Sequence, residues 1–307
     1  GCTVTWTALL AGLALGKGDH EEQLAKSEAI VADGHRVYPQ VTPRPLNFEY
    51  QMAAPFLFEP FSVMKPVAAA DADGKKKIYA DAEFRKAFAD RIEGSRQEFK
   101  SAFDKIVISQ HQKNGDLDEK VLADVAREKG TTPVELMLDL ALETDLETRF
   151  RMPVANHNED EVEPLLKSGA TVLGLSDAGA HASQLCDACL PTYFLGRWVR
   201  EKQSFTLEEA VRMLTSRPAE VAGISDRGLL LEDRPADVVV FDPETVRAGG
   251  LERVFDFPAG ADRLIAREKG VRAVVVNGTV LRENGTDALA PYGDLPGGVL
   301  RNGQAAA

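Results

Sequence analysis

Apolar runs alternate with amphipathic stretches along the first part of the chain. Residues 4–10 are apolar and β-branched, which predicts a strand. Residues 21–32 have helical periodicity and stop before Gly34, and residues 36–42 predict the next strand. A strand, a helix and a strand in this order indicate two parallel strands joined by a crossover helix.

A long excursion is expected after this unit. Residues 45–100 combine an aromatic, proline-containing stretch with a charged helical stretch, and residues 105–109 predict a short strand. An amphipathic helix is expected over residues 118–129. Thr132-Pro133-Val134-Glu135 has the pattern of a capping box with proline at the first helical position, so another helix should begin there.

The next strand carries the strongest chemical signal. Residues 159–167 predict a helix, and the buried-type strand over residues 171–175 runs directly into Ser176-Asp177-Ala178-Gly179-Ala180-His181. Thr206 then begins a helix that we expect Pro218 to close. The alternation of strands and helices indicates an α/β fold with a parallel sheet or barrel.

The pattern changes after Gly228. Residues 236–241 and 271–281 predict short strands, and Asn277-Gly278 is a strong signal for a type I′ hairpin. We therefore expect two regions: residues 1–228, with an insertion around 45–100, and a small β-domain segment over residues 229–303.

Charge and composition exclude several classes of partner. The 307 residues have a net charge of −12, which argues against nucleic acid and anionic membranes, and no apolar run reaches the length of a membrane span. Three cysteines suit a reducing compartment. The start of the chain has no signal-like segment, so we expect a cytoplasmic protein. Residues 1–6 read as the middle of a strand with no lead-in, which predicts that the chain is part of a longer protein.

Asp177 is the first candidate for catalysis. Active sites of parallel α/β folds lie beyond the carboxyl ends of the strands, where Asp177 would sit. A carboxylate at that edge can bind a metal or take a proton from water. An aspartate that caps a loop or helix is an equally good reading of the spacing.

Two further residues could bind a substrate. His181 lies four residues after Asp177 and could contact substrate or orient the carboxylate, although a loop histidine bonded to a backbone carbonyl is the commoner situation. Arg44 follows the second strand and could bind a carboxylate through two hydrogen bonds, or form a structural salt bridge.

A complete metal site is not evident. Catalytic zinc typically has three protein ligands. The chain has no His-x-His or HExxH, and His111, which follows a strand, is the best spare ligand. Cys186 and Cys189 form a CxxC, but a zinc ribbon needs a second pair, so two partly buried thiols are the better interpretation.

Several segments together resemble a known family. They resemble the C-terminal half of amidohydrolases, in the branch that contains the N-acyl-D-amino-acid deacylases (D-aminoacylases). The segments that carry the resemblance are residues 176–181, 207–218, 226–228, 236–242 and 274–278. The resemblance implies part of a metal-dependent (β/α)8 TIM-like barrel plus a small C-terminal β-sandwich segment.

The resemblance also implies a function. It makes Asp177 a metal ligand or general base for hydrolysis of non-peptide carbon–nitrogen bonds, with His181 and Arg44 as substrate-binding residues and an N-acyl-D-amino acid as substrate. It implies one or two divalent ions, zinc by preference, whose ligands lie mostly upstream of Gly1, because this chain lacks the family's His-x-His. The alternatives are a cyclic-amide hydrolase of the dihydroorotase or hydantoinase kind and a non-catalytic member. The oligomeric state stays open, a homo-oligomer included.

Overall fold

Three parallel strands form the part of the fold that the β-α-β pattern predicts. The computed structural model describes residues 2–14, 19–176, 179–186, 188–290, 293–301 and 303–305. The strands β1 (Val4–Trp6), β2 (Val37–Val41) and β7 (Val172–Leu173) lie side by side in the order β1-β2-β7, and all pairs are parallel. The helix α1 (His20–Ala32) connects β1 to β2, so the predicted parallel pair with a crossover helix is confirmed.

One apolar cluster joins this sheet to the helices that cover it. Val41 and Leu173 of the strands pack with Leu165 and with the fully buried Trp198. The helices on this side of the molecule are α8 (Glu159–Lys167), α9 (Leu190–Tyr193), the π-helix η3 (Phe194–Glu201), α10 (Leu207–Leu214) and α11 (Ser216–Ala222).

Pro218 does not close the helix that begins after Thr206, so that expectation is wrong. The helix α10 ends at Leu214, and Pro218 lies in the first turn of α11. The first turn of a helix has no partner for its backbone N–H groups, and a proline is therefore tolerated there. The capping box at Thr206 is present, with Glu209 as its second member.

A second sheet lies in the long segment between β2 and β7, residues 42–171, which we call the excursion. It contains β3 (Leu46–Gln51), β4 (Val107–Gln110), β5 (Lys120–Val121) and β6 (Arg149–Ala155), antiparallel in the order β3-β6-β4-β5. Its helices are η1 (Ser62–Met64), α2 (Lys65–Ala69), α3 (Ala72–Ala80), α4 (Ala82–Glu93), α5 (Gln97–Phe103), η2 (Gly115–Leu117), α6 (Leu122–Glu128) and α7 (Pro133–Glu143).

The aromatic residues of the excursion form its core. Phe58, Phe88 and Phe150 are fully buried in one apolar cluster, with Phe58 and Phe88 packed edge to face. The predicted cap of α7 is also confirmed, because Thr132 Oγ1 accepts a hydrogen bond of 3.2 Å from the backbone N–H of Glu135.

The last third of the chain is built from antiparallel strands. They are β8 (Val238–Phe241), β9 (Arg247–Val254), β10 (Arg263–Lys269), β11 (Val271–Val276), β12 (Thr279–Glu283), β13 (Thr286–Asp287), β14 (Leu300–Arg301) and β15 (Gln304–Ala305), with η4 (Pro258–Gly260) between β9 and β10. Asn277 and Gly278 join β11 to β12 with φ of 46° and 80°. Two positive φ values are the signature of a type I′ turn, so this hairpin is confirmed.

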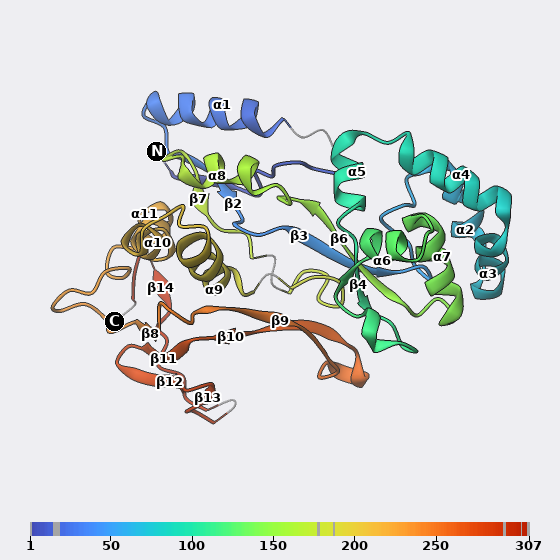
Figure 1. The fold of residues 1–307 in the computed structure, drawn as a ribbon. Coiled ribbons are helices and arrows are strands. Elements are labelled where there is room, and N and C mark those ends of the chain that lie inside the picture. Colours follow the sequence, from blue (N-terminus) through green and yellow to red (C-terminus); the bar gives the residue numbers. More distant parts are fainter. Residues whose placement is uncertain are drawn as a thin grey trace.

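Figure 1 shows how these parts are arranged. The helix α1 lies along the top left, near α8, and the excursion with α2 to α7 occupies the right side. The strands β3 and β6 run between the two, and the long β9–β10 hairpin passes beneath α9 and the excursion sheet. In the described part of the chain, no helix is long and apolar enough to cross a membrane.

Candidate functional site at the carboxyl ends of the parallel strands

The carboxyl ends of β1, β2 and β7 meet at one edge of the parallel sheet. The backbone N–H of Gly174 donates to Val41 O at 3.0 Å, which extends the pairing of β7 with β2 to the edge. A Cβ on Gly174 would lie 3.1 Å from Gln40 Oε1, so glycine lets the two strands stay close there. Asp177 and Ala178, which follow, lie outside the described residues.

A cavity of about 600 Å³ opens beside these strands. It is lined by Thr3, Thr5, Arg36, Gln40, Val172, Leu173, Gly174, Pro218, Val221, Ala222 and Gly223. Small-molecule sites have volumes of roughly 300–1,000 Å³, and this space is therefore large enough for a small ligand. Gln40 and Gly174 place one end of the cavity at the strand edge that leads to Asp177.

The loop after Asp177 turns sharply. Gly179 and His181 both have left-handed backbone conformations, with φ of 88° and 45°. The carbonyl of His181 accepts hydrogen bonds from the backbone N–H groups of Gln184 and Leu185 at 2.7 and 3.1 Å. The His181 side chain is exposed, with its ring centroid 6.1 Å from that of Phe48, so it can contact a molecule at this edge.

Hydrogen bonds from four distant parts of the chain hold the carbonyls of this loop. Leu264 N donates to Ala182 O at 2.8 Å, and Arg253 Nη2 donates to Ser183 O at 3.0 Å. Glu49 N donates to Gln184 O at 2.7 Å, and Arg44 Nη1 donates to Cys186 O at 3.1 Å. The backbone that follows Asp177 is thereby fixed from β10, β9, β3 and the segment after β2.

Arg44 is buried beneath this loop. Its guanidinium Nη1 also donates to Cys189 Sγ at 2.6 Å, and the group lies over the Tyr193 ring at 5.6 Å from the centroid. Burial, with a smaller contribution from the Glu159 carboxylate, raises the pKa of Tyr193 to about 12, so the phenol is neutral at physiological pH. Through these contacts, Arg44 links the loop to the segment that follows β2.

The two cysteines of the CxxC are buried thiols and are not joined in a disulfide, as the sequence predicts. Cys186 and Cys189 are 8% and 5% exposed, whereas Cys2 is exposed.

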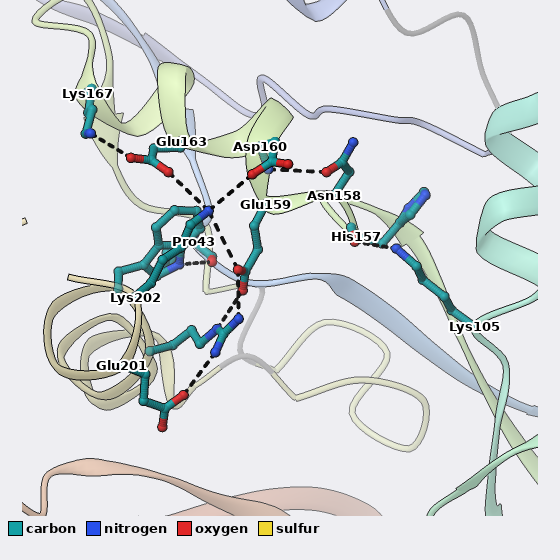
Figure 2. A network of polar contacts seen from close by, with 12 residues as sticks. Pro43, Lys105, His157, Asn158, Glu159, Asp160, Glu163, Lys167, Glu201 and Lys202 are labelled. Atoms are coloured by element: carbon teal, nitrogen blue, oxygen red, sulfur yellow. Dashed lines mark hydrogen bonds and ion pairs between the residues drawn. The ribbon is translucent and has the colours of Figure 1, made fainter. Parts of the chain in front are cut away.

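A network of ion pairs joins α8 to the end of η3, the helices next to Pro43 (Figure 2). Trp198 Nε1 donates to the backbone oxygen of Pro43, the residue before Arg44, at 2.6 Å. Lys202 Nζ lies 3.1 Å from Glu163 and 3.7 Å from Glu159, which joins η3 to α8. Hydrogen bonds from Lys167 and Lys202 lower the pKa of Glu163 to about 2. The helices that position Pro43 are thus held together by ion pairs.

The described histidines do not assemble into a metal site. His111 is buried in the excursion, with Nε2 3.5 Å from Glu143 Oε2, so it is not at the strand edge. His20 Nε2 lies 4.0 Å from Glu161 Oε2. Burial and the nearby Lys105 lower the pKa of His157. Among the residues that the structure describes, no three His, Cys, Asp or Glu side chains converge on a metal position.

Glu49 and Arg253 are the site residues that sequence reasoning missed. They are 204 positions apart and form an ion pair beside the loop. No local spacing links them, because the contact depends on how the excursion and the C-terminal strands pack.

Comparisons with known proteins point to one family. The sequence profile of the amidohydrolase family matches residues 77–282. The chain is 40% identical over 111 residues to N-acyl-D-glutamate deacylase of Alcaligenes xylosoxydans xylosoxydans, an alignment that covers 36% of this chain and 20% of the relative. It is 30% identical over 165 residues to D-aminoacylase of the same organism, covering 53% of this chain and 31% of the relative.

A solved structure aligns with most of the chain. The crystal structure of N-acyl-D-glutamate deacylase from Bordetella bronchiseptica, complexed with zinc and a phosphonate inhibitor, aligns with a TM-score of 0.49 at 22% identity. The alignment covers 93% of this chain and 48% of that chain. The chain therefore spans about half the length of this relative.

Proposed function

Because the chain belongs to the amidohydrolase family, we propose that the protein containing it hydrolyses non-peptide amide bonds, with N-acyl-D-amino acids as substrates. The observation that carries the proposal is the shared edge of β1, β2 and β7, since β7 leads directly to Ser176 and Asp177. The adjacent cavity supports a small-molecule substrate.

The same proposal assigns the architecture. Residues 1–228 form part of a TIM-like barrel, with an insertion around residues 45–100, and residues 229–303 form a β-sandwich segment. The parallel order β1-β2-β7 supports the first assignment, and the antiparallel order β13-β12-β11-β8 supports the second.

Asp177 acts as the general base in this proposal. Its carboxylate takes a proton from a water molecule while the water oxygen attacks the amide carbon. The carboxyl group then gives that proton to the leaving nitrogen, the carbon–nitrogen bond breaks, and a carboxylic acid and a free amine are formed. The proton taken from water is the one delivered, so the carboxylate is regenerated.

His181 and Arg44 have different places in the proposal. The exposed ring of His181 is available to bind the substrate carboxylate or to orient Asp177. Arg44 was expected to bind that carboxylate. Its contacts with Cys186 O and Cys189 Sγ favour the alternative role of holding the loop.

The described residues do not by themselves fit a zinc ion, because no three suitable side chains converge among them. A metal therefore enters the proposal only as an expectation, with Asp177 as one ligand and the others outside this chain.

A substrate panel tests the function. The purified protein that contains this chain is incubated with N-acetyl-D-glutamate, N-acetyl-D-leucine, their L-enantiomers, dihydroorotate and a hydantoin, and release of free amine or ring opening is measured. The proposal predicts turnover of at least one N-acyl-D-amino acid, with the L-form at least tenfold slower.

The other outcomes are equally definite. Ring opening of dihydroorotate or the hydantoin without deacylation would favour the cyclic-amide alternative. No turnover of any compound, with zinc supplied and the protein folded, would favour a non-catalytic member of the family.

A further inference from the structure

A cluster of four charged side chains, built around the buried Glu49, lies against the loop that follows Asp177. Glu49 of β3 is 4% exposed, and the Arg253 side chain of β9 is 11% exposed. Arg253 pairs with Glu49 through Nη2 and with Asp262 through Nη1. Arg149 of β6 completes the cluster, with Nη1 3.5 Å from Glu49 and Nη2 3.7 Å from Asp262.

This cluster binds two consecutive carbonyls of the loop. Arg253 Nη2 donates to Ser183 O at 3.0 Å, and the backbone N–H of Glu49 donates to Gln184 O at 2.7 Å. The hairpin partner of β9 adds a third bond, from Leu264 N to Ala182 O at 2.8 Å. The ion pair between Glu49 and Arg253 therefore ties together the two donors that hold the loop.

Arginine suits this position for a geometric reason. Its planar guanidinium presents several donors in fixed directions, and Arg253 uses them for two carboxylates and one carbonyl at once. A lysine ammonium could pair with a carboxylate, but it could not reproduce this fork. The two arginines also pair with Glu49 and Asp262, so the buried Glu49 carboxylate does not lie without a counter-charge.

We propose that Arg253 is a positioning residue for the loop of residues 179–186, and through it for Asp177. The Arg253–Glu49 pair couples the β9–β10 hairpin and the excursion sheet to the backbone that carries the base. The part of this inference that concerns catalysis rests on the proposed function. The part that concerns the loop stands on the hydrogen bonds alone.

The loop carries its own reporters. Cys186 and Cys189 are buried at its end, and the exposed Cys2 is an internal reference. We would label the protein containing this chain with a thiol reagent and follow each cysteine by peptide mass mapping. The variants are Arg253→Met, Arg253→Lys and, as a matched control on the same hairpin, Arg267→Met, which breaks the exposed pair with Glu252.

The proposal predicts a specific pattern. Arg253→Met should raise the labelling rates of Cys186 and Cys189 at least tenfold, while Arg267→Met leaves them within twofold. The raised rate should not change with urea below the onset of unfolding, because the loop opens locally and not with the whole protein. Arg253→Lys should recover most of the thermal stability but not the protection of the thiols, since it restores a charge without the fork.

Activity provides a second readout. With an amide that the protein hydrolyses, Arg253→Met should lower kcat at least tenfold and change KM less than threefold, because the base is misplaced while the substrate still binds. If no amide is hydrolysed, the proposed function fails and the thiol rates still decide the loop's dependence on Arg253.

Three results would overturn the proposal. They are unchanged thiol labelling in Arg253→Met, a rise that Arg267→Met shares, and a rise that follows the unfolded fraction in urea. If Arg253→Met does not fold, Arg253→Lys carries the test, and full thiol protection in that variant would refute the need for the guanidinium.

Discussion

Replacing Trp198 by phenylalanine tests whether the helix η3 holds the segment after β2. Trp198 is fully buried, and its indole Nε1 donates to Pro43 O at 2.6 Å. Phenylalanine keeps an aromatic ring in the core but cannot donate this hydrogen bond. Pro43 precedes Arg44, so the change acts at the base of the loop that Arg44 fastens.

The magnitude follows from two terms. A buried carbonyl left without its donor costs about 1–3 kcal/mol. The smaller ring leaves roughly 50 Å² of apolar surface unburied, which at about 25 cal/mol/Å² amounts to ~1 kcal/mol. The free energy of unfolding should therefore fall by about 2–4 kcal/mol. With an unfolding entropy of about 2.1 cal/mol/K per residue, this lowers the Tm of a 307-residue chain by roughly 3–6 °C.

The assay is thermal unfolding followed by circular dichroism, with Trp6→Phe as the matched control. Trp6 and Trp198 are the two tryptophans of the chain, and Trp6 is only partly buried. Trp6→Phe should lower Tm by less than half as much. Equal shifts in the two variants, or no shift for Trp198→Phe, would refute the role of the hydrogen bond to Pro43.

Three smaller perturbations test local features. Thr132→Ala removes the cap hydrogen bond to Glu135 and should cost about 1 kcal/mol in urea unfolding, whereas Thr132→Ser should be nearly neutral. Gly278→Ala should cost roughly 1–2 kcal/mol, because φ is 80° there while the space around a new Cβ is open, and an unchanged midpoint would refute this account of the turn. Burial and Lys105 lower the pKa of His157 below 6.5, so the folded state binds a proton less readily than the unfolded chain. The stability contributed by the neutral ring is present above about pH 6.5, and it is lost as the pH falls through the lower pKa of the folded state. Between about pH 7 and pH 5, the Tm of the parent should therefore fall more than the Tm of His157→Gln.

Local sequence signals predicted the elements that depend on neighbouring residues. The β-α-β unit, the cap at Thr132 and the Asn277-Gly278 turn are set by hydrophobic period, side-chain capping and positive φ, all of which act over a few residues. The resemblance to amidohydrolases is confirmed by the match over residues 77–282.

Elements that depend on distant partners were not predictable in the same way. The sheet of the excursion pairs β3 with β6, about a hundred residues later, and no short motif specifies that register. The end of α10 at Leu214 was missed because Pro218 reads equally as a stop and as a first-turn residue.

In the candidate site, too, the local features were predictable and the long-range contacts were not. The position of Asp177 after β7 is a local feature and was evident from the strand pattern, although its side chain lies outside the described residues. The contacts of Arg44 with Cys186 and Cys189 join residues more than 140 positions apart. Sequence spacing could place Arg44 near the edge, but it could not distinguish a substrate-binding residue from one that holds a loop.

The most direct test of the central claim is the rate of Asp177→Asn on an N-acyl-D-amino acid that the parent protein deacylates. Asp90→Asn is the control, since Asp90 is 70% exposed on α4. A general base contributes about 10²–10⁴-fold, so kcat/KM should fall by at least about 100-fold in Asp177→Asn and stay within twofold in Asp90→Asn. A value of kcat/KM in Asp177→Asn within a few fold of the parent would contradict the assignment of Asp177 as the base.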